Sequence, residues 1–271
     1  MTTFEELPPG ETGLLSVRPG PDLTEAGYVE REYVARGTAV SYGGHEPADY
    51  ATRVVVRRPE SPGSCSGTVV VEWLNVSSGA DAAPDWNYLA EEIVRRGHTW
   101  VGVSAQHMGV EGGEAPVGVA DVAQGGLRAL PRFAALRHPG DAYCYSIYAS
   151  VAAALDEGPL SDLVVDVLLA VGESQSAFAL TTFVNVVHEQ APVFDAFLIH
   201  SRGGGAMPLG EPGEAMDPLG YRGTRPVPIR DDLDIPVLML QTETDLTGAL
   251  RYLPARQPDS AYVRLWEVAG R

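Results

Sequence analysis

The chain contains no lysine, only two cysteines and no apolar run long enough to cross a membrane. Its 19 basic residues are all arginine and stand against 36 acidic residues, so the formal net charge is -17. Nucleic acids and anionic membranes bind basic surfaces, and this charge therefore argues against both as partners. The composition suits a soluble protein that binds uncharged or cationic small molecules.

The two cysteines, Cys65 and Cys144, lie far apart and form no C-x-x-C pattern. We therefore expect neither a disulfide framework nor a metal site, and no cofactor. The N-terminal segment is acidic and lacks the apolar stretch of a secretory signal. We expect a cytoplasmic protein, and the composition indicates no particular oligomeric state.

Apolar residues make up 45% of the 271 residues, which suits one large α/β domain with a full core. Strand-like segments alternate with helical ones, a pattern typical of a mostly parallel sheet with helices on both faces. Residues 1–27 are rich in proline and glycine and are expected to be irregular. Strands are expected at 28–42, 50–58, 68–74, 99–105, 162–171, 194–201, 235–240 and 261–268, and helices at 84–96, 143–155 and 177–190.

Two irregular inserts, about 108–141 and 202–232, interrupt this alternation and are rich in glycine and proline. Long irregular segments in a compact domain are usually functional. Ligands of parallel sheets bind at the carboxyl ends of the strands, so we expect both inserts to lie there and to form the walls of a pocket. Tyr143, Tyr145 and Met207 are candidates for lining it, and ordinary packing is the alternative for each.

The most informative segment is an apolar run that ends in Gly-Glu-Ser-Gln-Ser at residues 172–176. A helix-forming segment follows, so the order is strand, tight turn and helix, as a nucleophile elbow requires. Such a turn projects one serine hydroxyl from the end of the strand. Ser176 departs from the usual G-x-S-x-G pattern, but its side chain is still small. The alternative interpretation is a strand-to-helix turn whose serine caps the helix.

Four segments occur in a fixed order: Glu-Trp-Leu-Asn-Val-Ser at 72–77, His-Pro-Gly-Asp at 138–141, Gly-Glu-Ser-Gln-Ser at 172–176 and Leu-Trp-Glu-Val-Ala-Gly at 265–270. With them the chain resembles the α/β-hydrolase superfamily and, within it, the group called alpha/beta hydrolase domain proteins. The resemblance extends from about Tyr28 to the end. It implies an α/β-hydrolase fold and a serine hydrolase that acts on small-molecule esters.

The superfamily's chain order is serine, then acid, then histidine. On this order Ser174 is the predicted nucleophile and Asp245 the predicted acid, with Glu243 as the competitor for the second role. Asp245 could instead be a turn residue or a helix cap. The predicted oxyanion donors are the backbone N–H groups of Gln175 and Val76. For the second donor, the residues on either side of Val76 remain alternatives.

The sequence leaves the catalytic base open, because all six histidines precede Asp245. The resemblance places the base just after the strand at 261–268, where the printed chain stops. We interpret residues 1–271 as a single domain whose base lies beyond Arg271, so that this chain alone is a poor hydrolase. A second hypothesis is that His200 or His107 substitutes, since both follow strands. A third is a protein that binds a ligand or partner in the same cleft without catalysis.

Overall fold

The structure, a computed structural model, describes residues 1–10, 14–15, 20–114, 117, 126–217, 220 and 225–270. In this part of the chain nine strands form one sheet in the order β1-β2-β3-β5-β4-β6-β7-β8-β9. The strands are β1 (Thr3–Glu6), β2 (Tyr28–Ala39), β3 (Ala48–Pro59), β4 (Thr68–Trp73), β5 (Thr99–Val103), β6 (Val167–Glu173), β7 (Ala196–His200), β8 (Val237–Thr242) and β9 (Val263–Val268). The helices are α1 (Pro84–Arg96), α2 (His107–Glu111), α3 (Cys144–Ala153), α4 (Gln175–Thr182) and α5 (Glu243–Thr247).

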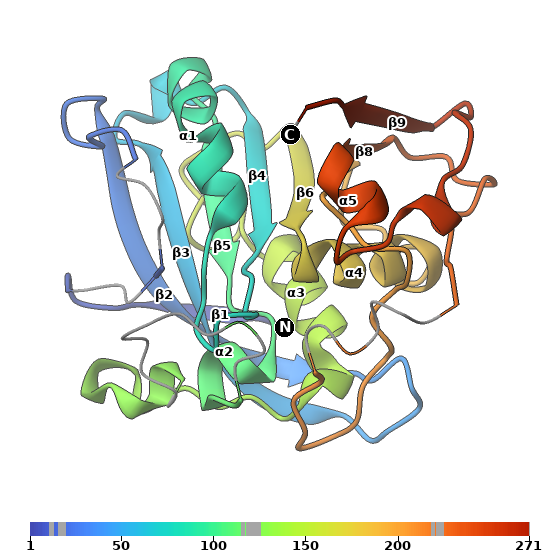
Figure 1. Cartoon of the computed structure of the whole chain (residues 1–271). Helices are drawn as coiled ribbons and strands as arrows, with labels where there is room; N and C mark the ends of the chain where they lie inside the picture. Colours follow the sequence, from blue (N-terminus) through green and yellow to red (C-terminus); the bar gives the residue numbers. More distant parts are fainter. Residues whose placement is uncertain are drawn as a thin grey trace.

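The sheet is parallel from β5 to β9 and antiparallel at the opposite edge, where β1, β2 and β3 pair with one another and β3 pairs with β5 (Figure 1). The predicted mostly parallel α/β architecture is therefore confirmed. The N-terminal residues contribute β1, whereas their composition predicts an irregular segment. Because β1 pairs with the long strand β2, its backbone donors and acceptors are satisfied there despite the weak strand pattern.

Helices cover both faces of the sheet, as predicted. On one face Trp86 and Ile93 of α1 pack with Val70 and Trp100. On the other face α3 and α4 pack against Val69 and the remaining inward residues of β4. Successive side chains of a strand point to opposite faces, so the continuous apolar run of β4 serves both layers.

The predicted boundaries hold best where the chain carries stop signals. Helix α1 begins at Pro84 and ends at Arg96 as predicted, with Gly97 after it at φ 70°. Strand β6 starts at Val167 rather than at 162, because its pairing with β4 begins where Thr68 meets Val167. The helix after the turn starts two residues earlier than predicted, at Gln175, and continues as a π-helix over Phe183–Val187.

The described residues of the two inserts lie at the end of the sheet toward which β4 and β6 point, as predicted (Figure 1). Asp141 joins them to the segment after β5. Its Oδ1 accepts the backbone N–H of His107 at 2.8 Å and its Oδ2 accepts that of Met216 at 2.8 Å. Within the described residues, no helix is long and apolar enough to cross a membrane.

Candidate active site

Ser174 occupies the turn between β6 and α4 with φ 55° and ψ -110°. This left-handed backbone is unusual for a residue with a side chain. The Ser174 N–H donates to the carbonyl of His200 at 2.9 Å, so the turn is tied to the neighbouring strand β7. A Cβ at Gly172 would come within 3.0 Å of the Ser176 Cβ and 3.1 Å of the Leu180 side chain. The sharp turn and the close approach of strand and helix predicted from the sequence are both present.

Ser176, the departure from the usual pattern, is completely buried. Its Cβ fits beside Gly172, but its hydroxyl oxygen has no hydrogen-bond partner among the described residues. A buried hydroxyl without a partner contributes nothing to stability, so the position requires a small residue and not a serine as such.

A pocket of 350 Å³ opens beside Ser174. Glu173 and Ser174 line it, and the loop after β4 and the start of α1 supply most of the other lining residues. Its wall residues include Asn75, Ser77, Ala82, Pro84 and Tyr88. Ser174 thus has an adjoining space for a small substrate, and that space is lined by apolar groups, uncharged polar groups and the carboxyl group of Glu173.

The inserts contribute less to this pocket than predicted. Of their described residues, Val117 is the one in its wall. Tyr143, Tyr145 and Met207 are buried and do not line it. The Tyr145 hydroxyl donates to the Met207 carbonyl at 3.0 Å. The expectation that these three residues line the pocket is wrong, and their packing beneath the inserts is the correct alternative.

The loop after β4 is bonded directly to the turn that carries Ser174. The Asn75 side chain donates from Nδ2 to the Glu173 carbonyl at 3.0 Å and accepts the Ser77 N–H at 2.9 Å. The N–H of Val76, one predicted oxyanion donor, points to Oε1 of the Gln175 side chain at 3.3 Å. This donor already has a partner within the protein, so it is available to a substrate only if the Gln175 side chain gives way.

The two candidate acids follow β8. Asp245 is buried, and its Oδ2 accepts the Thr242 N–H at 2.7 Å in a capping box at the start of α5. The alternative interpretation of Asp245 as a helix cap therefore describes one of its contacts. Glu243 is directed elsewhere, since its Oε2 accepts the N–H of Gly270 at 2.9 Å.

His200, one of the two alternative bases, forms a pair that the sequence did not suggest. Its Nδ1 lies 3.0 Å from Oδ1 of Asp85, a buried carboxylate in the first turn of α1. Burial lowers the pKa of His200, but the carboxylates of Asp85, Glu173 and Asp245 outweigh it and raise the pKa above its ordinary value. The one available signal for Asp85 was its place after Pro84, at a helix start that follows a strand.

His107, the other alternative base, belongs to a different cluster. Its ring contacts the ring of His138 edge to face, with 5.9 Å between the ring centroids. Its Nδ1 is buried without a hydrogen-bond partner among the described residues, and burial lowers its pKa. His107 is not among the described residues that line the Ser174 pocket. Its position supports the packing of the inserts rather than a role beside Ser174.

Glu173 lines the pocket and lies near charged groups from three other elements: Asp85 on α1, His200 on β7 and Asp245 on α5. Burial raises the pKa of Glu173 to about 8; Asp85 and Asp245 add to the rise and His200 opposes it. At neutral pH this carboxyl group is therefore largely protonated and uncharged. The described residues contain no group of three or more His, Cys, Asp or Glu arranged to hold a metal ion.

The raised pKa of Glu173 predicts that its contribution to stability changes with pH. Between about pH 4.5 and 8 the unfolded chain releases this proton while the native chain keeps it, so the native state loses stability as pH rises. We expect Glu173→Gln to lack this loss, so its advantage over the native protein should grow by on the order of 5 kcal/mol across that interval. Urea unfolding at several pH values measures the difference, and a constant difference would contradict the prediction.

A family model described as "Alpha/beta hydrolase domain" matches residues 4–271. A comparison with curated proteins found no match. Similar solved structures include a cold-adapted esterase from an Arctic intertidal metagenomic library, with 14% identity, coverage of 90% of this chain and 86% of that chain, and a TM-score of 0.48. Thermogutta terrifontis esterase 2, phosphoramylated by tabun, has 13% identity, coverage of 88% and 83%, and a TM-score of 0.45. A lipase/esterase from Lactobacillus plantarum has 12% identity, coverage of 86% and 92%, and a TM-score of 0.47.

At 12–14% identity these structural likenesses concern the fold alone, and the assignment rests on the family model. The match to the family model covers residues 4–271, nearly the whole chain, and includes the Ser174 turn. The α/β-hydrolase fold implied by the resemblance is confirmed. The chain belongs to the alpha/beta hydrolase domain family.

Proposed function

We propose that this protein is a serine hydrolase that cleaves small-molecule esters through Ser174. The observation that carries the proposal is the left-handed backbone of Ser174 at a strand-to-helix turn beside a 350 Å³ pocket. A serine keeps such a backbone only where the surrounding structure enforces it, and backbone strain of this kind concentrates at active sites. The family model matched by the chain, an alpha/beta hydrolase domain, agrees with a hydrolase.

In the proposed reaction, the Ser174 hydroxyl attacks the ester carbonyl and gives its proton to a histidine base. The carbonyl oxygen becomes an oxyanion, which the N–H of Gln175 stabilises. Gln175 is the first residue of α4, and the N–H groups at a helix start have no acceptor within the helix. Collapse of the intermediate expels the alcohol, which takes the proton from the base. Water then attacks the acyl carbonyl and gives a proton to the base. The acid product is released, and the Ser174 oxygen leaves and takes the proton from the base.

The N–H of Val76 is the proposed second oxyanion donor. It is now bonded to the Gln175 side chain at 3.3 Å, a long hydrogen bond for an amide. A developing oxyanion is a stronger acceptor than a neutral amide oxygen. We propose that the substrate oxygen replaces the Gln175 side chain at this N–H as charge accumulates.

Asp245 is the proposed acid. The Ser174 turn follows β6 and Asp245 follows β8, with β7 between them. Two strand spacings amount to about 10 Å between the backbones. One imidazole ring with a hydrogen bond at each nitrogen spans about 8 Å, so the side chains of Ser174 and Asp245 have to close the rest of the distance. The carboxylate of Asp245 raises the pKa of Glu173, which agrees with the proximity of Asp245 to the Ser174 turn. The histidine position implied after β9 lies outside the described residues.

A second arrangement is favoured by one contact, the 3.0 Å pair of His200 and Asp85. An imidazole whose Nδ1 donates to a buried carboxylate is oriented as the base of a triad is. In this arrangement His200 is the base and Asp85 the acid. No hydrogen bond joins Ser174 to a histidine side chain in the described part of the chain. Catalytic hydrogen bonds often tighten only when substrate binds, so the two arrangements are separated by mutation.

The test is labelling of the full-length protein with a fluorophosphonate probe, followed by mass mapping of the labelled peptide. We expect one label on Ser174, and Ser174→Ala should abolish it and lower p-nitrophenyl ester hydrolysis by roughly 10⁴- to 10⁶-fold. Ser176→Ala is the matched control two residues away. Because the Ser176 hydroxyl has no partner among the described residues, this variant should keep both labelling and hydrolysis and should be at least as stable as the native protein.

The rival is a protein that uses the same pocket to bind a ligand or partner without chemistry. It predicts no label on Ser174 in the full-length protein and equal, background hydrolysis by the native protein and Ser174→Ala. These two results together would contradict the hydrolase proposal.

A further inference from the structure

The loop at residues 75–83, here called the pocket loop, forms one wall of the Ser174 pocket and carries the proposed second oxyanion donor. Its two ends are joined by reciprocal backbone hydrogen bonds between Asn75 and Ala82, at 2.9 and 2.8 Å. Asp81 lies in this loop but is not part of the pocket wall, and its side chain is completely buried. A charged side chain buried behind a pocket wall needs a partner, and that partner sets where the wall stands.

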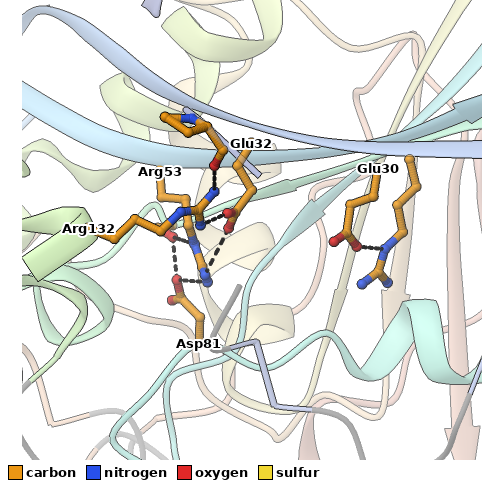
Figure 2. A network of polar contacts seen from close by, with 8 residues as sticks. Glu30, Glu32, Arg53, Asp81 and Arg132 are labelled. Atoms are coloured by element: carbon orange, nitrogen blue, oxygen red, sulfur yellow. Dashed lines mark hydrogen bonds and ion pairs between the residues drawn. The ribbon is translucent and has the colours of Figure 1, made fainter. Parts of the chain in front are cut away.

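The partner is Arg53 of β3, whose side chain is completely buried. Its Nη2 donates to Oδ2 of Asp81 at 2.7 Å, and its Nε donates to the hydroxyl oxygen of Ser104 at 3.3 Å. The Ser104 hydroxyl in turn donates to Asp81 Oδ2. Figure 2 shows the guanidinium group of Arg53 between Asp81 and Glu32. The pocket loop is thus fixed to two strands by a planar, directional group.

The network is balanced in charge. Glu32 of β2 lies 3.5 Å from Arg53 and also pairs with Arg132, which donates to the Pro8 carbonyl at 2.6 Å (Figure 2). Two arginines therefore face two carboxylates. A buried set of this kind contributes little net stability compared with apolar side chains of the same volume. Its distinctive effect is geometric, because the donors of a guanidinium group have fixed directions.

The carboxylate of Asp81 is closely packed. A Cβ at Gly109 would collide with Asp81 Oδ1, so α2 packs directly against the oxygen that does not accept from Arg53 Nη2. Movement of Asp81 would carry the pocket loop with it. That loop reaches the Ser174 turn through the bond from Asn75 to the Glu173 carbonyl and the bond from Val76 to Gln175.

We propose that Arg53 is a positioning residue: by clamping Asp81 it holds the pocket loop so that the Val76 N–H reaches the oxyanion. The inference rests on the proposed hydrolase function. Arg53 is buried and does not line the Ser174 pocket, so its loss acts on the transition state through a displaced donor. A displacement of about 1 Å at a reacting group costs roughly 10²-fold in rate. The loss should appear in kcat, with KM nearly unchanged.

The experiment compares Arg53→Met, Arg53→Lys and a double variant that carries both Arg53→Met and Asp81→Leu. All are made in the full-length protein and measured at a temperature below the Tm of each variant. Arg57→Met is the matched control. Arg57 lies on the same strand and pairs with Glu30 at 2.6 Å. Figure 2 shows Glu30 apart from the Arg53 network. We expect kcat to fall roughly 10²-fold in both Arg53 single variants. Methionine has no donor, and the lysine ammonium lacks the fixed planar arrangement of donors of a guanidinium group. The double variant should regain stability without regaining kcat, and Arg57→Met should change kcat less than about twofold.

Amide hydrogen exchange in the pocket loop gives a readout that does not depend on activity. Exchange at residues 76–79 should quicken at least tenfold in Arg53→Met and stay unchanged in Arg57→Met. Two results would overturn the proposal. One is unchanged exchange in the pocket loop of Arg53→Met, and the other is recovery of kcat together with stability in the double variant. If the native protein has no esterase activity but the exchange difference appears, Arg53 does hold the pocket loop in place and the proposed hydrolase function is wrong.

Discussion

Asp245→Asn should lower kcat for ester hydrolysis by about 10⁴-fold in the full-length protein, with KM nearly unchanged. The amide that replaces the carboxylate cannot stabilise the imidazolium that forms in the transition state, and it favours the wrong tautomer of the base. The measurement is steady-state hydrolysis of p-nitrophenyl esters. The variant also keeps a side-chain oxygen for the Thr242 N–H, so the capping contact at α5 survives and the loss reports on catalysis.

Asp85→Asn and His200→Gln are the controls for the position of the acid and base. If Asp245 is the acid, each of these should lower kcat less than tenfold, because His200 and Asp85 then only shape the charge around Glu173. The opposite result, a small loss in Asp245→Asn and a 10³- to 10⁴-fold loss in both other variants, would transfer the roles to His200 and Asp85. Glu243→Gln should remain close to the native protein in either case.

Glu72→Ala should lower the free energy of unfolding by about 4 kcal/mol, a large part of the total stability of an ordinary domain. Glu72 is completely buried in β4, where its carboxylate accepts the N–H groups of Asp85 and Trp86 at 2.9 and 2.8 Å and the indole N–H of Trp100 at 2.8 Å. Alanine leaves three buried donors without an acceptor, and each such donor costs about 1–3 kcal/mol. Urea unfolding with an unchanged m-value measures the loss.

Glu72→Gln separates the lost acceptors from the lost charge. Burial raises the pKa of Glu72, and the nearby carboxylate of Asp85 raises it further, so the native site already disfavours the ionised form. Glutamine keeps an oxygen for Trp86 and Trp100 and loses one acceptor, and we expect a cost of about 1 kcal/mol. If alanine cost no more than glutamine, water would have to be satisfying the three donors and the argument would fail.

The sequence predicted best those features that are encoded by neighbouring residues. Pro84 and Gly97 define α1 because each restricts the backbone locally, and the sharp turn at Ser174 follows from an apolar run that meets small residues. The strand before that turn was predicted too long, because Val164 is apolar and yet 73% exposed. Only pairing with β4 decides where β6 begins, and pairing is not a local property.

The chemistry of the site depends on contacts between distant segments, which one sequence does not reveal. His200 and Asp85 are 115 residues apart, and Arg53 of β3 reaches Asp81 in the loop after β4, 28 residues further along the chain. The prediction that Tyr143, Tyr145 and Met207 line the pocket was wrong for the same reason: Tyr145 follows one insert in the chain but packs under the other one. Residue types suggested a nucleophile and an acid, whereas burial and pairing determine which charges surround them.

The strand order also has a consequence for the way the protein is made. β4 lies between β5 and β6, both of which are synthesised after it, and Ser174 gains its backbone bond to His200 only when β7 has emerged. Pairings of this kind between distant segments form slowly. A nascent chain that has reached residue 174 but not residue 200 therefore carries its serine on an open sheet edge, and the turn acquires its support only as the next strand arrives.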